Sequence, residues 1–361
     1  MADDPAPSPP PHRRRLRYAG KYPRRFEEKY KERDPRRHAE TVARVLASGK
    51  TPAGTHRPVM VEEVLEILAP RPGEFAVDAT LGHGGHAQEI LARLQPGGHL
   101  LGLDTDPIEL PKTEARLRAL GFGPETLAVR RSNFAGLPQV LATVDFSGRR
   151  EPGADLILAD LGVSSMQIDD PARGFSVKLA GPLDMRMNPQ RGQPAAALLA
   201  RLKPEALAAV LDENADEPDA ALLAPALAGR RFATTTELAR AVRAALPRLR
   251  KDTADQAVRR VFQALRIAVN DEFSALETFL RHLPACLNPG GRVAILTFHS
   301  GEDRRVKRAF AAGFRDGLYS DISREVIRPS AGERHANPRS APAKLRWTRA
   351  GVSPEHSIVR D

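Results

Sequence analysis

The chain has 361 residues, of which 41% are hydrophobic and 28% charged, enough for one large domain with an insertion or for two domains. Its formal net charge of +10 favours a polyanionic partner such as nucleic acid. Cys286 is the only cysteine, which excludes an internal disulfide, a cysteine-based zinc site and a Cys-x-x-Cys redox pair.

The start of the chain differs from the rest, and we expect a basic, disordered extension over residues 1–54. The prolines at 9–11 disfavour packing, and clusters of arginine follow them. Three of the four tyrosines are interleaved with these arginines, a composition suited to RNA phosphates and stacked bases. A solubilising extension without RNA contacts is the alternative. No apolar run long enough for a signal peptide or a membrane span occurs, so we expect a cytoplasmic protein without a membrane partner.

Strands that alternate with helices predict a parallel, doubly wound sheet from about residue 55 onward. Apolar side chains recur at helical spacing over residues 61–68, before Pro70. Strands are expected at residues 75–77, 99–104, 126–130 and 156–159.

The alternation stops at about residue 166. From 166 to 266 the pattern is helical and rich in Ala and Leu, which predicts an inserted helical domain. Its arginines indicate an anion-facing surface, with a solvated helix face as the alternative. A turn at 288–291 and a strand at 292–298 then resume the sheet. Residues 55–165 and 267–361 are therefore expected to form one domain.

A glycine-rich loop follows the first predicted strand. The segment GHGGHA at 82–87 matches a form of the dinucleotide fingerprint, and Asp104 ends the next strand, where an acid accepts hydrogen bonds from ribose hydroxyls. An NAD site and an S-adenosylmethionine (SAM) site share this geometry. Asp78 before the loop and Asp160 after the fourth strand favour SAM. Glycines that only make a turn and carboxylates that only cap helices are the structural alternatives.

Several longer strings occur in a fixed order along the chain. They are DLGVSS at 160–165, RGFS at 173–176, GPLDMRM at 181–187, FQALRI at 262–267, FHS at 298–300 and NPRS at 337–340. These strings resemble the signature of the RsmH (MraW) family, SAM-dependent methyltransferases that modify the N4 of a cytidine in small-subunit ribosomal RNA. The resemblance covers residues 55–348. It implies a class I SAM-dependent methyltransferase fold, Rossmann-like with a doubly wound sheet and an inserted helical domain.

The resemblance also implies the cofactor site and the partner. The family's SAM contacts carry over to Gly84, Gly85, His86, Asp104, Phe134, Asp160 and Gln167. The implied partner is 16S rRNA, with a target cytidine in the decoding (P-site) region and residues 166–266 as the RNA-substrate domain. No metal site is predicted, and the sequence leaves open whether the protein forms a homodimer.

The amine of cytosine is a poor nucleophile because its lone pair delocalises into the ring, so the reaction needs a hydrogen-bond acceptor on N4–H. Asp160 is the predicted catalytic acceptor, with the hydroxyls of Ser164 and Ser165 or loop carbonyls as alternatives. Methylation at ring carbon C5 would require a cysteine nucleophile to attack the ring, and Cys286 is disfavoured because it lies before a turn on the far side of a helix from any predicted loop.

The chain departs from the family pattern mainly in the insertion and its flanks. Met166 stands where the family has Pro, and Gly301 replaces a Leu. These departures concern substrate choice more than chemistry. Nearby, His299, Glu302 and Asp303 are expected either to line the substrate side or to form a helix start capped by Ser300. An NAD-dependent oxidoreductase and an inactive RNA-binding assembly factor are the rival functions.

Overall fold

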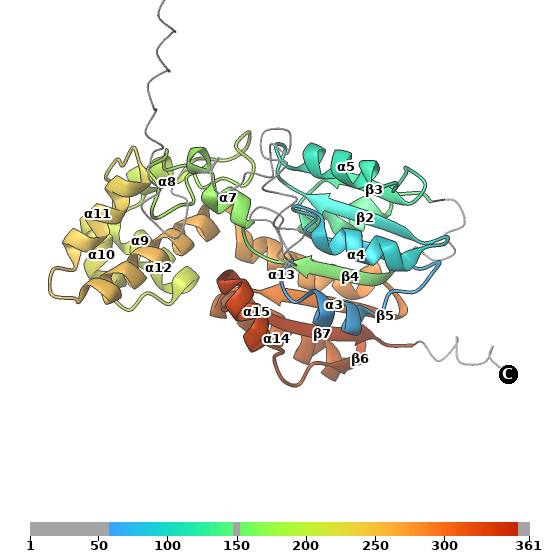
Figure 1. Ribbon diagram of the computed structural model, residues 1–361. Helices are drawn as coiled ribbons and strands as arrows, with labels where there is room; N and C mark the ends of the chain where they lie inside the picture. Colours follow the sequence, from blue (N-terminus) through green and yellow to red (C-terminus); the bar gives the residue numbers. More distant parts are fainter. Residues whose placement is uncertain (1–57, 147–151, 353–361) are drawn as a thin grey trace, which may run out of the picture. The chain divides into compact units, whose positions relative to one another are not determined.

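Seven strands form one mixed sheet in a computed structural model that describes residues 58–146 and 152–352 (Figure 1). In sheet order they are β3 (Leu127–Arg131), β2 (His99–Asp104), β1 (Phe75–Asp78), β4 (Ala154–Asp160), β5 (Leu287–Thr297), β7 (Lys344–Ala350) and β6 (Tyr319–Ile322). The first five are mutually parallel, whereas β7 runs antiparallel to both of its neighbours. This order is the class I methyltransferase arrangement, so the predicted fold class is confirmed.

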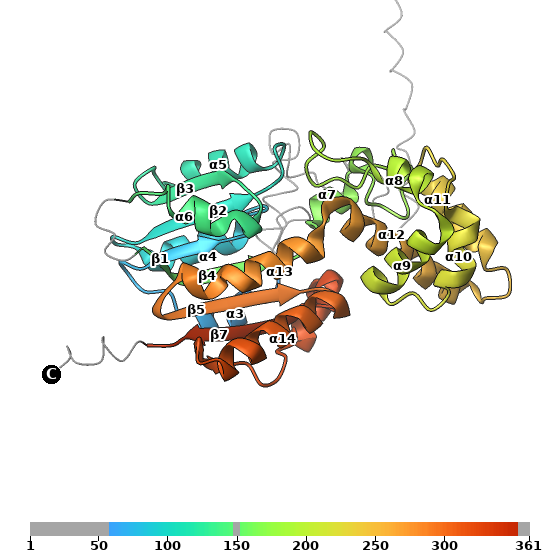
Figure 2. The same ribbon diagram turned by 180° about the vertical axis from the view of Figure 1, so that it is seen from behind.

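Successive residues of the central strands point into two different cores, one on each face of the sheet. Val77 and Ile157 belong to one core, and their neighbours Ala76 and Leu156 belong to the other. The first face is covered by α6 (Leu137–Leu141), α13 (Glu272–His282) and α14 (Ser300–Arg315), and the second by α3 (Val61–Leu68), α4 (Gly85–Leu94) and α5 (Leu110–Ala119) (Figure 2). Both faces of the sheet are therefore buried, as a parallel sheet requires.

The elements predicted before residue 166 match the observed ones closely. The helix at 61–68 coincides with α3, and the four predicted strands correspond to β1 to β4. The strand predicted at 292–298 was too short, because β5 begins at Leu287 and includes the predicted turn, with a register shift opposite Ala154. No prediction covered β6 and β7, since the charged residues of β7 (KLRWTRA) obscure its strand pattern.

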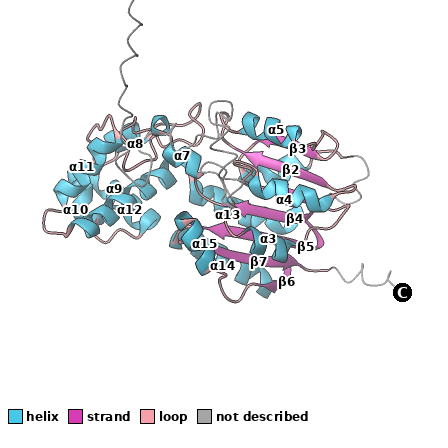
Figure 3. Cartoon of the chain, in the orientation of Figure 1, coloured by secondary structure: helices cyan, strands magenta, loops and turns pink. Residues whose placement is uncertain are grey.

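Between β4 and α13 the chain forms helices that share a hydrophobic core of their own (Figure 3). They are α7 (Ser165–Asp169), α8 (Ala195–Arg201), α9 (Pro204–Ala215), α10 (Ala220–Leu227), α11 (Thr235–Ala245) and α12 (Lys251–Asn270). Thr234 starts α11 by accepting a hydrogen bond from the backbone N–H of Glu237 at 3.3 Å. The predicted boundary at residue 266 falls inside α12, so the limits of the insertion remain a prediction.

Candidate active site

A cavity of about 990 Å³ lies at the carboxyl ends of β1, β2 and β4, where open α/β sheets bind their ligands. The loops after these strands and residues of α12 line it. Eight of the nine predicted site residues lie on its wall: Gly84, Gly85, His86, Asp104, Phe134, Asp160, Ser164 and Gln167. The ninth, Ser165, begins α7, and its side chain is outside the part of the structure that is described.

The glycine loop after β1 has room for backbone only. Gly84 has φ +70° and precedes α4, and a Cβ on it would lie 2.9 Å from Cγ2 of Thr113. A Cβ on Gly85 would lie 2.9 Å from Cγ of Pro58. The hydroxyl of Thr113 also donates a hydrogen bond to the carbonyl oxygen of Gly82 at 2.6 Å. Packing within the protein therefore accounts for these glycines, and it leaves the loop backbone facing the cavity.

Asp104 joins the glycine loop to the loop after β2. Its Oδ2 accepts a hydrogen bond from the backbone N–H of Gly82 at 2.8 Å, and its Oδ1 accepts one from that of Asp106 at 2.8 Å. Burial raises the pKa of Asp104, and these hydrogen bonds oppose that rise. An ionised carboxylate has about four lone-pair sites, so Asp104 retains acceptor capacity toward the cavity.

Asp160 ends β4, and its carboxylate is poorly satisfied within the protein. Its backbone N–H donates to Oγ1 of Thr80 at 2.6 Å, which fixes the end of the strand. Oδ1 is buried and has no hydrogen-bond partner among the described residues, while Oδ2 lies 3.7 Å from Nε2 of His86, beyond hydrogen-bonding distance. Burial, together with the charges of Asp78 and Glu302, raises the pKa of Asp160 to about 8.

The neighbouring acids are more deeply buried. Burial raises the pKa of Asp78 to about 7, and Asp78 accepts a hydrogen bond from the backbone N–H of Thr80 at 3.1 Å. Glu302 lies in the first turn of α14, where its Oε2 accepts a hydrogen bond from the backbone N–H of Phe298 at 2.8 Å. His86, which faces Asp160, has its pKa lowered by burial to about 4, so its imidazole is neutral at pH 7.

The expectations for the start of α14 are met in part. Glu302 lines the cavity, but His299 and Asp303 do not. The predicted helix cap at Ser300 was wrong, because His299 is the N-cap and its Nδ1 accepts from the backbone N–H of Glu302 at 3.4 Å. The Ser300 hydroxyl donates instead to Asp216, across to the end of α9. Asp303 is held by Arg346 and Lys344 of β7.

Phe134 stands on the wall of the cavity where its ring is partly buried. It begins a short 3₁₀ turn, Phe134–Gly136, that Asn133 caps through its side-chain oxygen. Its ring meets that of Phe279 edge to face, with centroids 5.4 Å apart. The second face of an aromatic ring held in this way is suited to a flat heterocycle.

The side-chain amide of Gln167 bonds within the protein. Its Nε2 donates to Oδ2 of Asp106 at 2.8 Å, and its Oε1 accepts from the backbone N–H of Ser164 at 3.0 Å. The hydroxyl oxygen of Ser164 in turn accepts from the backbone N–H of Gln167 at 3.2 Å. Gln167 therefore shapes the loop after β4, and its contact with SAM remains a prediction.

A buried ion pair that sequence reasoning missed connects the insertion to this network. Nη1 of Arg173 donates to Oδ2 of Asp106 at 2.8 Å, and the two side chains are 8% and 1% exposed. Nη2 of Arg173 donates to the carbonyl oxygen of Met187 at 2.7 Å, and the backbone N–H of Met187 donates to Asn270 of α12. Arg173 lies in the RGFS string, which was the only sequence signal for its role.

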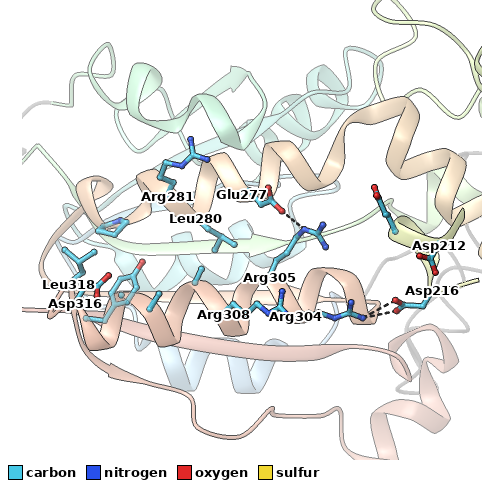
Figure 4. Close-up of a pocket in the computed structure, with 16 residues that line it drawn as sticks. Asp212, Asp216, Glu277, Leu280, Arg281, Arg304, Arg305, Arg308, Asp316 and Leu318 are labelled. Atoms are coloured by element: carbon cyan, nitrogen blue, oxygen red, sulfur yellow. Dashed lines mark hydrogen bonds and ion pairs between the residues drawn. The ribbon is translucent and has the colours of Figure 1, made fainter. Parts of the chain in front are cut away.

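A second cavity, of about 780 Å³, lies between α9, α13 and α14 (Figure 4). Arg304 pairs with Asp216 at 3.0 Å, and Arg305 pairs with Glu277 at 2.8 Å. Acidic and basic side chains are mixed along its wall, and none of the predicted site residues lies there. It is therefore a solvated groove between α9 and the two sheet-covering helices rather than a candidate active site.

Three further observations concern residues 58–146 and 152–352. No group of three or more His, Cys, Asp or Glu side chains is arranged to hold a metal ion, and no helix has the length and apolarity to cross a bilayer. Cys286 is buried in the core behind the sheet, and burial raises the pKa of its thiol to about 11. The thiol does not line the cavity.

Known proteins similar to this chain agree with the resemblance found in the sequence. A model of the MraW methylase family matches residues 53–350. A protein of Agathobacter rectalis named Ribosomal RNA small subunit methyltransferase H 1 is 48% identical over 345 residues, which cover 93% of this chain and 97% of that protein. A protein of Alkaliphilus metalliredigens named Ribosomal RNA small subunit methyltransferase H 2 is 49% identical, with 92% and 96% covered. The Halorhodospira halophila protein named Ribosomal RNA small subunit methyltransferase H is 43% identical, with 80% and 86% covered.

Proposed function

The chain belongs to the MraW methylase family, and from that premise we propose that it transfers a methyl group from SAM to the N4 of a cytidine in the decoding (P-site) region of 16S rRNA. The observation that carries this proposal is that the glycine loop, Asp104, Asp160 and residues of α12 all line the same cavity. The names of the relatives support small-subunit ribosomal RNA as the substrate class.

Several residues on the cavity wall suit parts of SAM. Gly84 and Gly85 line the cavity, Asp104 accepts from the ribose hydroxyls, and Phe134 offers a ring face to the adenine. Carboxylates of Asp78 and Asp160 suit a ligand that carries positive charge. When bound, SAM supplies an electrophilic methyl group on sulfur.

The insertion supplies the RNA side of the cavity. Arg259, Phe262 and Gln263 of α12 line it opposite the strand ends. Arginine neutralises phosphates, whereas the ring of Phe262 is 5% exposed and belongs to the core of the insertion, so it is not available to stack on a base. The target cytidine has to leave any stack to bring its N4 to the methyl group.

Asp160 is the proposed acceptor of N4–H. Its side chain is 28% exposed, its Oδ2 lies 3.7 Å from His86 and beyond hydrogen-bonding distance, and it lines the cavity at the end of β4. A carboxylate there increases electron density on N4 and receives the proton that N4 loses. The hydroxyl of Ser164 already accepts one hydrogen bond and is a second candidate, with Ser165 beside it.

The proposed function is tested by incubating the purified full-length chain and SAM with small ribosomal subunits whose RNA lacks the modification. Mass spectrometry of the RNA nucleosides is expected to detect N4-methylcytidine, and fragment mapping to assign it to the decoding region. Methylation of another base or of large-subunit RNA would overturn the proposal. Binding of NAD rather than SAM would favour the oxidoreductase, and binding of SAM and RNA without methylation would favour an assembly factor.

A further inference from the structure

Three carboxylates from separate elements meet on the wall of the active-site cavity: Asp78 at the end of β1, Asp160 at the end of β4 and Glu302 in α14. We refer to them as the acidic cluster. Asp78 and Glu302 are 1% and 3% exposed, whereas the Asp160 side chain is 28% exposed. Asp160 is thus the member of the cluster that a ligand in the cavity can touch.

The side chains that face Asp160 leave its charge uncompensated. They are Asp78 from β1, His86 from α4 and Glu302 from α14. His86 is 6% exposed, its Nε2 has no hydrogen-bond partner, and its ring is neutral. Within residues 58–146 and 152–352, no lysine or arginine forms an ion pair with Asp160.

The guanidinium that interacts with the acidic cluster belongs to Arg266, and its interaction is with Glu302. Nε and Nη2 of Arg266 donate to the two oxygens of Glu272 at 2.8 and 2.9 Å. This bidentate pair occupies the guanidinium, and His299 interacts with Glu302 at 3.1 Å. Asp78 has one backbone donor and a further acid, Asp104, nearby. The cluster therefore lacks a cation of its own at the point where it meets the cavity.

SAM and its product S-adenosylhomocysteine (SAH) differ by one methyl group and by the positive charge on sulfur. We propose that the acidic cluster distinguishes the two, and that binding of SAM removes a proton from Asp160. Asp160 then becomes an acceptor for N4–H only when the methyl donor is present. This inference rests on the proposed function, because it assumes that SAM occupies this cavity.

The physical reason is that the Asp160 carboxylate is repelled by its acidic neighbours in the free protein and attracted by the sulfonium charge when SAM is bound. Burial and two neighbouring acids hold Asp160 mostly protonated at neutral pH, and the pKa values of Asp160 and Asp78 are both far above the ordinary value. A sulfonium charge within a few ångströms favours the carboxylate instead. SAH carries no such charge, so it leaves the proton in place.

The proposal also balances the protons of the reaction. Binding of SAM releases one proton from Asp160 to solvent. During transfer the sulfur–methyl bond breaks with its electron pair left on sulfur, the N4–methyl bond forms, and the N4 proton passes to Asp160. The cluster is then protonated again beside a neutral sulfur, which weakens the hold on SAH and favours its release.

The experiment is calorimetric titration of the full chain with SAM and with SAH at about pH 7, each in two buffers of different ionisation enthalpy. We expect roughly one proton to be released per SAM and almost none per SAH, and SAM affinity to rise with pH while SAH affinity does not. In Asp160→Asn the proton release is lost, and SAM affinity falls about tenfold, the equivalent of one pKa unit, while SAH affinity is retained. Glu277→Gln, an acid-to-amide change in the other cavity, is expected to behave as the parent chain does.

Equal proton release for SAM and SAH in the parent chain would overturn the proposal, and so would an unchanged preference for SAM in Asp160→Asn. The parent-chain comparison holds even if the variant fails to fold. A chain that methylates RNA and releases no proton on binding SAM would refute this inference alone. A chain that binds neither SAM nor SAH would refute the proposed function as well.

Discussion

Asp104 and Asp160 show how one residue type acquires different properties at the ends of two strands, β2 and β4, on either side of β1. Asp104 accepts two backbone hydrogen bonds, whereas Asp160 has a buried oxygen without a partner. The sequence predicted both positions because each acid ends an apolar strand. It did not predict the proximity of His86 to Asp160, which arises because β1 and β4 are neighbours in the sheet.

Replacement of Asp104 by Ala is expected to weaken SAM binding by about 1.5–3 kcal/mol, because the ribose hydroxyls lose a hydrogen bond to a charged acceptor. The variant also loses the acceptor for the backbone N–H groups of Gly82 and Asp106, so the loops it joins become less ordered. Calorimetry on the folded variant checks this, with Asp104→Asn as the matched control. Unchanged SAM affinity in Asp104→Ala would remove Asp104 from the cofactor site.

The raised pKa of Asp160 predicts that the free energy of unfolding depends on pH. Its pKa in the folded protein, about 8, lies above the unfolded value, so the unfolded chain loses this proton first as pH rises. Stability from this group is therefore fully present below about pH 4 and is lost as pH rises toward 8. Asp160→Asn cannot ionise and avoids that loss. Thermal melts are expected to favour the variant increasingly between about pH 5 and pH 8, and a gap that is constant with pH would contradict the assignment.

At the scale of elements, the loop between α7 and α8 connects the insertion to the loop after β2 through Arg173. The ion pair of Arg173 with Asp106 joins residues 67 apart in sequence, a spacing that no periodicity reveals. Periodicity did predict the helices of the insertion, because their leucines form a core of their own. It failed for β7, which carries three charged residues, one of them the buried Arg346.

Breaking this pair is expected to be costly, since Arg173→Met leaves the carboxylate of Asp106 buried and without its guanidinium. The loss of unfolding free energy is expected to be about 3–5 kcal/mol, measured by urea denaturation. The matched control is Arg304→Met, which removes the exposed pair with Asp216 and is expected to cost less than about 1 kcal/mol (Figure 4). Similar losses of unfolding free energy in both variants would mean that the ion pair of Arg173 with Asp106 does not stabilise the fold more than an exposed pair does.

At the scale of the whole molecule, the basic extension over residues 1–54 lies outside the described residues. Part of it is nevertheless matched by the Agathobacter rectalis protein, because a match over 93% of the chain leaves only about 25 residues unmatched. The Halorhodospira halophila protein covers 80% of the chain, close to the extent of the family model alone.

Deletion of residues 1–54 is expected to leave SAM affinity intact and to weaken RNA binding. Because fewer phosphates are neutralised, log affinity for RNA is expected to fall less steeply with log salt concentration. Filter binding over a range of salt concentrations measures both slopes. Identical slopes with and without these residues would make the extension a solubilising segment.

The measurement that tests the central claim most directly is single-turnover methylation of small-subunit RNA by Asp160→Asn at saturating SAM and RNA. Saturation removes the contribution of binding, so the rate reports on the methyl-transfer step. The amide keeps the shape of the side chain and one acceptor oxygen but has no negative charge to favour loss of the N4 proton. We predict a rate at least about 100-fold below that of the parent chain, the scale of losing a well-placed electrostatic group. A rate close to that of the parent chain would contradict the account and would leave the Ser164 and Ser165 hydroxyls or the loop carbonyls as the groups that activate N4.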